Sequence, residues 1–292
     1  MATTRAIQRR IKSVRNISQV TRAMQMVAAS KMRRAQQATL ASRAYAAKAR
    51  EILTYLAAQP GRNKTLHPLL EMRSEIKNTL LILITSDRGL CGAYNMNILR
   101  ATLDFIKRQE KPVKLVTLGK RGRDFIVRSG KNIIAEFTGF SEKPTVLNIG
   151  PIAKIAIEEF ESGQVDRVDI AFTDFVNVLV QRPQIQQLLP LEQPAEPISG
   201  AHAVYLYEPD PESILATLLP RLTELQIYQA LLESVASEFS AQMVAMRNAT
   251  DNALELIDSY TLEMNKARQA TITKEMLDIV GGANALRETL AK

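Results

Sequence analysis

The residues of this chain that could do chemistry are few, and the most promising of them lie in one glycine-rich stretch. The segment "SDRGLCGAYN" (86–95) follows a short apolar run. A glycine-rich turn between a strand and a helix can cradle a phosphate group, but this one lacks the Walker pattern and holds only part of a dinucleotide fingerprint. We therefore favour a structural role, in which Gly89 and Gly92 let the chain turn tightly, over a nucleotide site.

The other candidate residues indicate no catalytic, cofactor-binding or metal-binding site. His67 and His202 are the only histidines, and neither has a neighbouring cysteine or carboxylate cluster. Cys91 is the only cysteine, which excludes an internal disulfide and a CxxC site. No serine, histidine and carboxylate can be assigned to a triad, and the basic segment 118–125 ("LGKRGRDF") is expected to be a solvated loop.

The basic residues are unevenly distributed along the chain. Of the 38 lysines and arginines, 12 lie in residues 1–50, which contain no aspartate or glutamate. The remaining 26 are outnumbered by all 30 acidic residues, so residues 51–292 sum to −4 and the net charge of +8 comes from the N-terminal arm. Such an arm usually has its own partner, which could be nucleic acid, an anionic membrane or a protein socket.

A protein socket is the favoured partner of this arm. A basic helix can enter a major groove, but here the base-reading side chains are not grouped on one face, and Tyr45 is the only aromatic residue before Tyr55. Binding to a membrane surface requires a broad apolar face with tryptophan or phenylalanine, which the arm lacks. The chain also has no apolar run of about 18 residues and no secretory signal, so we expect no membrane span.

Two long stretches at the ends of the chain are free to be helical, because all 12 prolines and 10 of the 12 glycines lie in residues 60–220. Apolar residues recur at helical spacing in both stretches and form one narrow stripe on each. The first stripe comprises Ile7, Ile11, Val14, Ile17, Val20, Met24 and Val27; the second comprises Leu232, Val235, Phe239, Met243, Met246, Ala253, Ile257, Tyr260, Met264 and Ala267. We expect the stripes to be buried against one another in a coiled coil.

The middle of the chain is typical of an α/β sheet domain with helices on its faces. The last two strand candidates are separated by a short "DF" turn and should form an antiparallel hairpin at one edge. The predicted parts are an N-terminal helix (1–59), a central α/β domain (60–208) and a C-terminal helix (209–292) that pairs with the first. Strands are expected at 79–85, 113–118, 132–137, 165–173 and 176–181, and helices near 97–108 and 152–160.

Several motifs resemble the gamma subunit of the rotary F-type ATP synthase, bacterial type. The segment 272–285 ("ITKEMLDIVGGANA") is similar to the family signature, whose positions are filled without a gap by Ile272, Thr273, Glu275, Asp278, Gly282 and Ala283. Similar stretches are 21–36 ("TRAMQMVAASKMRRAQ"), 86–95, 205–211 ("YLYEPDP"), 243–253 ("MVAMRNATDNA") and 265–273 ("NKARQATIT"). Together they follow the family's order over the whole chain.

The resemblance implies an α/β fold in which a long antiparallel coiled coil of the N- and C-terminal helices carries an inserted Rossmann-like α/β domain. It implies a central shaft that couples ion-driven rotation of the c-ring to the sequential opening and closing of catalytic sites on beta subunits, for ATP synthesis and reverse hydrolysis. The implied partners are three alpha and three beta subunits, the epsilon subunit and the c-ring. Mg-ATP and Mg-ADP would bind to those partners, and this chain would hold no cofactor.

The resemblance also assigns contact residues. Beta subunits would be contacted by Arg268, Gln269, Thr273 and Met24; the c-ring and epsilon by Tyr207 and Glu208; and the collar at the tip by Ile279, Val280, Leu286 and Leu290. The plainer interpretations remain open. They are an exposed polar face of the coil for Arg268 and Gln269, a core position for Met24, and a turn before the helix for Tyr207 and Glu208.

Departures from the family narrow the assignment. The chloroplast branch carries an inserted cysteine pair that this chain lacks, so we expect no thiol regulation. The missing insert points to a bacterial protein that is peripheral at the cytoplasmic face of the plasma membrane and reaches the membrane only through partner subunits. The alternative function is that of a basic coiled-coil protein that binds nucleic acid.

Overall fold

The computed structural model describes residues 4–57, 67–73, 75–109, 111–140, 144–191 and 211–290. Its first and last elements are long helices, α1 (Thr4–Ala57) and α5 (Pro211–Leu290). The chain packs as two compact units, one of Met1–Val27 with Ala245–Lys292 and one of Ala28–Val244. None of the helices in the described residues has a stretch that is long and apolar enough to span a membrane.

The unit of residues 28–244 is built around a five-stranded sheet in the order β3-β2-β1-β4-β5. Neighbouring strands are parallel except β5, which is antiparallel to β4. This order, with helical crossovers between parallel strands, is Rossmann-like, as the sequence predicted. The elements are η1 (Pro68–Leu70), β1 (Thr79–Ile84), α2 (Tyr94–Arg108), β2 (Val113–Leu118), α3 (Lys120–Arg128), β3 (Ile133–Phe137), α4 (Val146–Glu161), β4 (Arg167–Phe175) and β5 (Gln181–Leu189).

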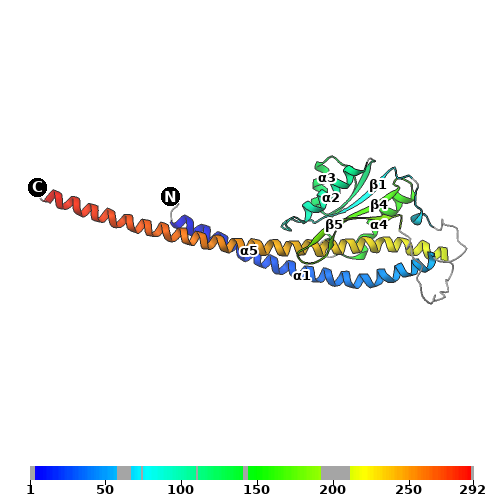
Figure 1. Ribbon diagram of the computed structural model, residues 1–292, viewed down its shortest axis with the longest axis horizontal. Coiled ribbons are helices and arrows are strands. Elements are labelled where there is room, and N and C mark those ends of the chain that lie inside the picture. The colour runs from blue at the N-terminus through cyan, green and yellow to red at the C-terminus, as the bar shows by residue number, and fades with distance from the viewer. Residues whose placement is uncertain are drawn as a thin grey trace. The chain divides into compact units, whose positions relative to one another are not determined.

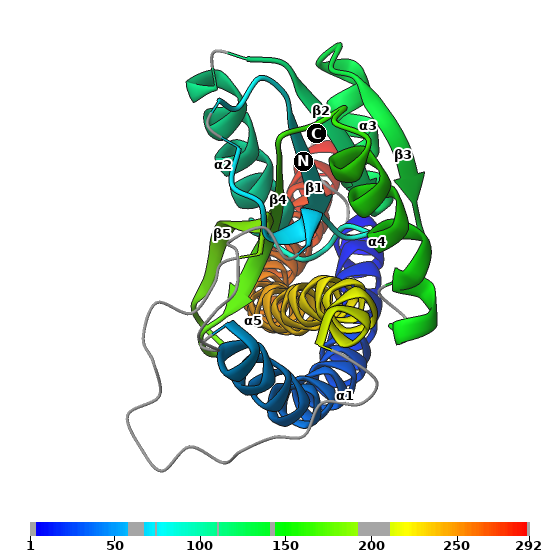
Figure 2. The same ribbon diagram turned by 90° about the vertical axis from the view of Figure 1, so that its right-hand side faces the viewer.

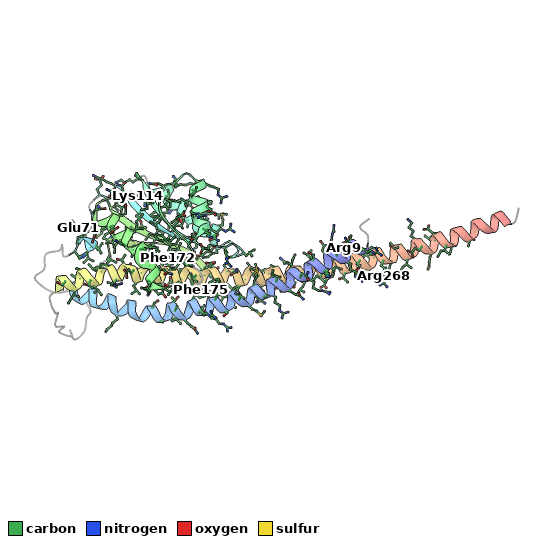
Figure 3. All side chains as sticks on the ribbon, turned by 180° about the vertical axis from the view of Figure 1, so that it is seen from behind. Arg9, Glu71, Lys114, Phe172, Phe175 and Arg268 are labelled. Atoms are coloured by element: carbon green, nitrogen blue, oxygen red, sulfur yellow. The ribbon has the colours of Figure 1, made fainter. Side chains whose placement is uncertain are left out.

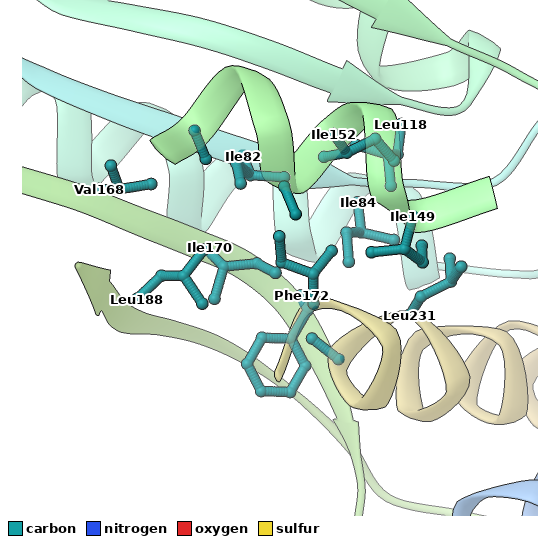
Figure 4. Close-up of a cluster of buried hydrophobic side chains, with 14 of the residues drawn as sticks. Ile82, Ile84, Leu118, Ile149, Ile152, Val168, Ile170, Phe172, Leu188 and Leu231 are labelled. Carbon is teal, nitrogen blue, oxygen red and sulfur yellow. The ribbon is translucent and has the colours of Figure 1, made fainter. Parts of the chain in front are cut away.

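The central strand β1 is apolar on both faces because helices cover both sides of the sheet (Figures 1 and 2). Leu81 and Leu83 pack with α2 and α3, whereas Leu80, Ile82 and Ile84 pack with α4 and α5. Figure 4 shows the second of these layers, where side chains of α4 and α5 meet the sheet. The N-terminal half of α5 is therefore part of the core of this unit as well as a neighbour of α1.

The hairpin at the sheet edge is present, but its second strand lies later in the sequence than predicted. Residues 176–180 form the turn, and β5 occupies Gln181–Leu189 instead of 176–181. The sequence of β5 is rich in glutamine because this is an edge strand on which alternate side chains are exposed. Pro183 is tolerated at an edge because its missing N–H breaks no interior ladder.

The segment 118–125 is not a solvated loop, as was predicted, but the end of β2 followed by α3. Gly122 and Ile126 form the buried face of this short helix, while its basic side chains face outward. The charges correctly indicated exposure of one face. They concealed a helix because only Gly122 and Ile126 are fully buried, while Phe125 is partly buried against the same core.

The predicted domain boundaries near residues 59 and 208 lie outside the described residues, so the three-part division stays a prediction. The compact units divide the chain elsewhere, after Val27 in α1 and after Val244 in α5. The physical reason is packing, since Met32 and Ala35 of α1 belong to the same hydrophobic core as the sheet.

In the unit of residues 1–27 and 245–292, α1 and α5 run antiparallel (Figure 1). Thr21 contacts Thr250, whereas Ile11 lies beside Thr261 and Met264. Residue numbers on α5 therefore decrease along the coil as those on α1 increase. The buried and half-buried seam positions are Ile7, Ile11, Val14, Ser18, Thr21 and Gln25 on α1, and Met246, Thr250, Ala253, Ile257, Tyr260, Met264 and Ala267 on α5. Their alternating steps of three and four confirm the predicted coiled coil.

The seam departs from the predicted stripe of α1 after Val14. Ile17, Val20 and Val27 are 52%, 58% and 55% exposed, and the prediction that they are buried in the coil was wrong. The predicted stripe takes successive three-residue steps here, and each falls about 60° short of a full helical turn. The stripe therefore rotates away from α5, and Ser18 occupies the seam instead.

Candidate partner-binding surfaces of the terminal helices

The carboxyl end of the sheet, where Rossmann-like domains bind nucleotides, is filled by side chains of this chain. Tyr94 is buried there, and its hydroxyl group lies against Ser234 of α5. Burial and the neighbouring Glu238 raise the pKa of Tyr94 well above its ordinary value. The space left among these side chains is ≈ 10 Å³, which is room for about one water molecule. A nucleotide does not fit in this space.

The N-terminus of α3, which could otherwise bind a phosphate group, is capped by a carboxylate of the glycine-rich segment. Asp87 Oδ1 accepts a hydrogen bond from the Lys120 N–H at 3.1 Å, and its Oδ2 accepts one from the Gly139 N–H at 2.8 Å. Gly92 has a φ of 57°, which a tight turn requires. The segment 86–95 thus makes its polar contacts within the chain.

Among the glycines in the described part of the chain, Gly119 has the least room for a side chain, and the sequence analysis did not single it out. Its φ is 100°, and a Cβ atom there would lie 2.2 Å from the carbonyl oxygen of Thr85. The Gly122 N–H donates to Thr85 Oγ1 at 2.8 Å. The close approach of α3 to the end of β1 explains both glycines, and the signal in the sequence was a glycine directly after a strand.

The larger apolar side chains of α1 between residues 17 and 27 face away from α5. Ile17, Val20 and Val27 are more than half exposed, and Met24, on the same stripe, is half-buried. Contiguous apolar side chains on a surface are typical of protein contacts. Part of Met24 is therefore available to a partner, while the rest packs beside the seam.

The predicted beta-contact residues on α5 all lie in solvent. Every described side chain from residue 268 to residue 284 is exposed, including Arg268, Gln269 and Thr273. The Thr273 hydroxyl donates to the Gln269 carbonyl oxygen at 3.0 Å, so it is used within the helix. Among the hydrogen bonds found in the described residues, none involves the side chain of Arg268 or of Gln269. Their placement fits both a contact role and an exposed polar face.

The tip of α5 presents apolar side chains to solvent in the same way. Ile279 and Val280 are 71% and 56% exposed. Leu286 and Leu290 lie in the helix, but their side chains are outside the described residues. Tyr207 and Glu208 also lie outside the described residues, so their predicted contacts with the c-ring and epsilon stay predictions.

Basic side chains line an open groove at the N-terminal end of α1. The groove has a volume of ≈ 800 Å³, and its wall on α5 is formed by Thr261 and Met264. Arg268, labelled with Arg9 in Figure 3, follows one helical turn after Met264. The charge count located this basic arm, but only the rotation of α1 in the coil shows which cations share a face. These are Arg5, Arg9, Lys12 and Arg15.

Comparison with known proteins decides the family. A sequence profile described as ATP synthase matches residues 3–286. The chain belongs to the ATP synthase family. The ATP synthase gamma chain of Dehalococcoides mccartyi (strain CBDB1) is 51% identical to it over 98% of this chain and 100% of that one. The gamma chain of Roseiflexus castenholzii is 49% identical over 99% of this chain and 100% of that one. These relatives confirm the predicted family and its bacterial type.

Solved structures confirm the predicted fold class. The central stalk and c-ring structure of Tetrahymena thermophila mitochondrial ATP synthase contains a chain that is 26% identical, with a TM-score of 0.60 over 79% of this chain and 99% of that one. A chain of Euglena gracilis mitochondrial ATP synthase matches with a TM-score of 0.67 over 97% of this chain and 94% of that one, and at 19% identity it supports the fold alone. The nucleic-acid-binding alternative is not supported by these matches.

Proposed function

We propose that this chain is the central rotor shaft of an F-type ATP synthase. It couples ion-driven rotation of the c-ring to the sequential opening and closing of catalytic sites on beta subunits, and reverse rotation accompanies ATP hydrolysis. The observation that carries the proposal is the end of α5, where every described side chain from residue 268 to residue 284 is exposed although many are apolar. Such a helix requires a partner surface around it.

The mechanism follows from the unequal faces of the terminal helices. The apolar stripe of Ile17, Val20 and Val27 lies on one side of the coil only, and the basic groove lies at one place along it. A shaft without threefold symmetry contacts three identical subunits differently, so each is biased toward a different conformation. Rotation transfers these biases around the ring, which couples shaft position to nucleotide affinity.

We assign the partner contacts as follows. Arg268, Gln269, Thr273 and Met24 contact beta subunits, and the basic groove that contains Arg9 faces acidic segments of the same ring, where opposite charge favours a specific but movable contact. The tip, with Ile279, Val280, Leu286 and Leu290, turns in the collar. Tyr207 and Glu208 face the c-ring and the epsilon subunit.

The proposal places the chemistry on other subunits. Mg-ATP and Mg-ADP bind to the alpha and beta partners, three of each, and this chain supplies differential contacts and no reacting group. It lies at the cytoplasmic face of the bacterial plasma membrane as a peripheral component. The closed carboxyl end of its sheet supports this division, because a nucleotide does not fit among Tyr94, Ser234 and Glu238.

Reconstitution tests the proposal. We would mix the full chain with alpha and beta subunits of a closely related bacterial enzyme and measure the mass of the product and its ATPase activity. A complex with three alpha, three beta and one copy of this chain, with multi-site hydrolysis that alpha and beta alone lack, is the expected result. If the chain stays unbound to a partner set that assembles with its own gamma chain, the proposal is wrong.

A further inference from the structure

Three serines of α5 form hydrogen bonds outside their own helix. The Thr173 N–H donates to Ser234 Oγ at 3.1 Å, Ser237 Oγ donates to the Thr173 carbonyl oxygen at 3.1 Å, and Ser240 Oγ donates to the Val178 carbonyl oxygen at 2.7 Å. All three serines are fully buried. We call these serines, with the backbone of Thr173 and Val178, the serine junction.

The threonines of α5 behave differently, which shows that the serine junction is not a general property of this helix. A hydroxyl group inside a helix commonly donates to the carbonyl oxygen four residues earlier. Each threonine of α5 for which a hydrogen bond is found does this: Thr217, Thr223, Thr250, Thr261, Thr271 and Thr273. Ser234 and Ser237 instead bond to the backbone of β4, and Ser240 bonds to the turn of the β4–β5 hairpin.

The serine junction replaces a missing strand partner at the end of β4. β1 pairs with β4 only as far as Ala171, so Thr173 extends beyond it. On its other side Thr173 pairs with Pro183 of the edge strand β5. A buried backbone group without a partner is costly, and Ser234 and Ser237 satisfy both backbone groups of Thr173. Ser240 reaches the turn of the same hairpin.

Hydrogen bonds at two separated points resist sliding and rotation of a helix more strongly than apolar packing does. The core contacts of Leu231, Val235 and Phe239 hold α5 on the sheet, but the hydrophobic effect has no preferred direction. Hydrogen bonds weaken steeply when their angle changes. Ser234 and Ser240 are about 9 Å apart along the helix axis. Bonds at both ends of that distance oppose sliding and rotation of α5 about its own axis, whereas one bond would act as a pivot.

We propose that the serine junction fixes the rotational position of α5 against the β4–β5 hairpin and so transmits torque from the α/β unit to the coil of α1 and α5. The serines are positioning residues, since they touch neither nucleotide nor beta subunit. This inference rests on the proposed rotor function, because a helix that transmits no torque needs no such anchor.

The test uses the assembled, membrane-reconstituted enzyme with three versions of the chain. These are the wild type, the S234A/S237A/S240A variant, and Ser162→Ala, which removes an exposed hydroxyl group from the end of α4 in the same unit. We would measure ATP hydrolysis and ATP-driven ion translocation in the same vesicles. We expect all three to hydrolyse ATP at similar rates, and the triple variant alone to lose at least about half of its translocation per ATP.

A second measurement separates loss of torque from loss of fold. In the full chain, hydrogen exchange of the Thr173 amide should become roughly tenfold faster when Ser234 is replaced by Ala, while amides in the centre of β1 keep their protection. If the triple variant does not fold, Ser240→Ala is used, because it leaves Thr173 satisfied and removes only the second anchor. Partial loss of translocation is then expected.

The two proposals fail in different ways. Wild-type chain that does not assemble contradicts the rotor function, whatever the variants do. Wild-type chain that assembles and pumps, together with serine variants that pump equally well per ATP, contradicts the serine junction and leaves the rotor function intact.

Discussion

The hydroxyl oxygens of Thr21 and Thr250 lie 2.7 Å apart across the seam between α1 and α5. Each hydroxyl group also reaches a carbonyl oxygen of its own helix, that of Ser18 at 3.1 Å and that of Met246 at 2.9 Å. A polar pair at a seam position weakens a coiled coil relative to an apolar pair but fixes its register. Ser18, at the neighbouring seam position, is also small, so few large apolar contacts hold α1 and α5 together in this stretch.

Replacing these threonines tests their coupling. We expect Thr21→Val to lower the free energy of unfolding of the full chain by about 1 kcal/mol, because it leaves a polar group of Thr250 without its partner across the seam. The T21V/T250V variant should cost less than the two single changes together, since both sides then become apolar. Urea unfolding of the four proteins measures this, and additive costs would mean that the pair is not coupled.

The beta-contact role of Arg268 is separable from folding. Because the side chain is exposed, Arg268→Ala should change the free energy of unfolding by no more than about 0.5 kcal/mol. In the reconstituted complex it should lower ATP-driven torque or the stability of the complex. The matched control is Lys266→Ala, which removes another exposed cation from the same helix. Equal coupling in both variants would assign Arg268 to the exposed polar face of the coil.

Met24 tests the outward stripe of α1. Met24→Lys places a cation on a half-buried position beside Ile17, Val20 and Val27, and we expect it to uncouple ion flow from ATP synthesis. The ammonium group would either be partly desolvated or pair too firmly with a beta carboxylate. Met24→Leu keeps the apolar contact and should couple normally. The measurement is ion translocation per ATP, and normal coupling by the lysine variant would make Met24 a core residue only.

Asp166 gives the chain a pH-dependent contribution to stability. Burial alone would raise the pKa of Asp166, but the Arg73 guanidinium at 2.7 Å and the N–H groups of Asn78 and Lys77 outweigh it and hold the pKa below its ordinary value. Because the folded pKa is lowered, the stabilisation is present above the unfolded value of about 3.9 and is lost as the pH falls through the folded value.

Asp166→Asn should therefore destabilise the chain at neutral pH and approach wild-type stability as the pH falls below about 4. Urea unfolding midpoints over this range provide the measurement. Glu255→Gln, at an exposed position of α5, is the control and should show no such convergence. A stability difference between Asp166→Asn and wild type that stays constant with pH would contradict the role of the carboxylate charge.

Two glycines with positive φ should respond very differently to alanine. At Gly119 a Cβ atom would lie 2.2 Å from a backbone oxygen, so Gly119→Ala should cost about 3 kcal/mol or more. At Gly130 φ is 68° and a Cβ atom would meet nothing within 4 Å, so Gly130→Ala should cost about 1 kcal/mol. Thermal unfolding of both variants measures the cost of backbone strain alone at Gly130 and the cost of strain plus steric overlap at Gly119. Equal costs would mean that α3 moves away easily.

Much of the architecture could be predicted from local patterns. The strand at 113–118 is predicted at its observed bounds, and β1 differs from its prediction by one residue. β1 is recognisable because a strand buried on both faces is almost continuously apolar, and β2 is recognisable because valine and leucine predominate in it. By contrast β5 and α3 escape prediction because each is half exposed, and their polar residues are typical of turns and loops.

The sequence by itself determines the family, the long terminal helices, the parallel sheet and the concentration of cations in the arm, because these depend on composition, periodicity and motif spacing along one element. Only the tertiary structure decides which face of α1 is buried. A seam of alternating steps leaves Ile17 and Val20 outside and brings Thr21 to Thr250.

Only the tertiary structure likewise places Ser234 and Ser237 on Thr173, about 60 residues away in sequence, and fills the nucleotide end of the sheet with Tyr94. Hydrophobic periodicity specifies that a helix is buried, but a hydrogen bond between distant elements depends on the rotation of each helix. That rotation is set by the packing of the whole core.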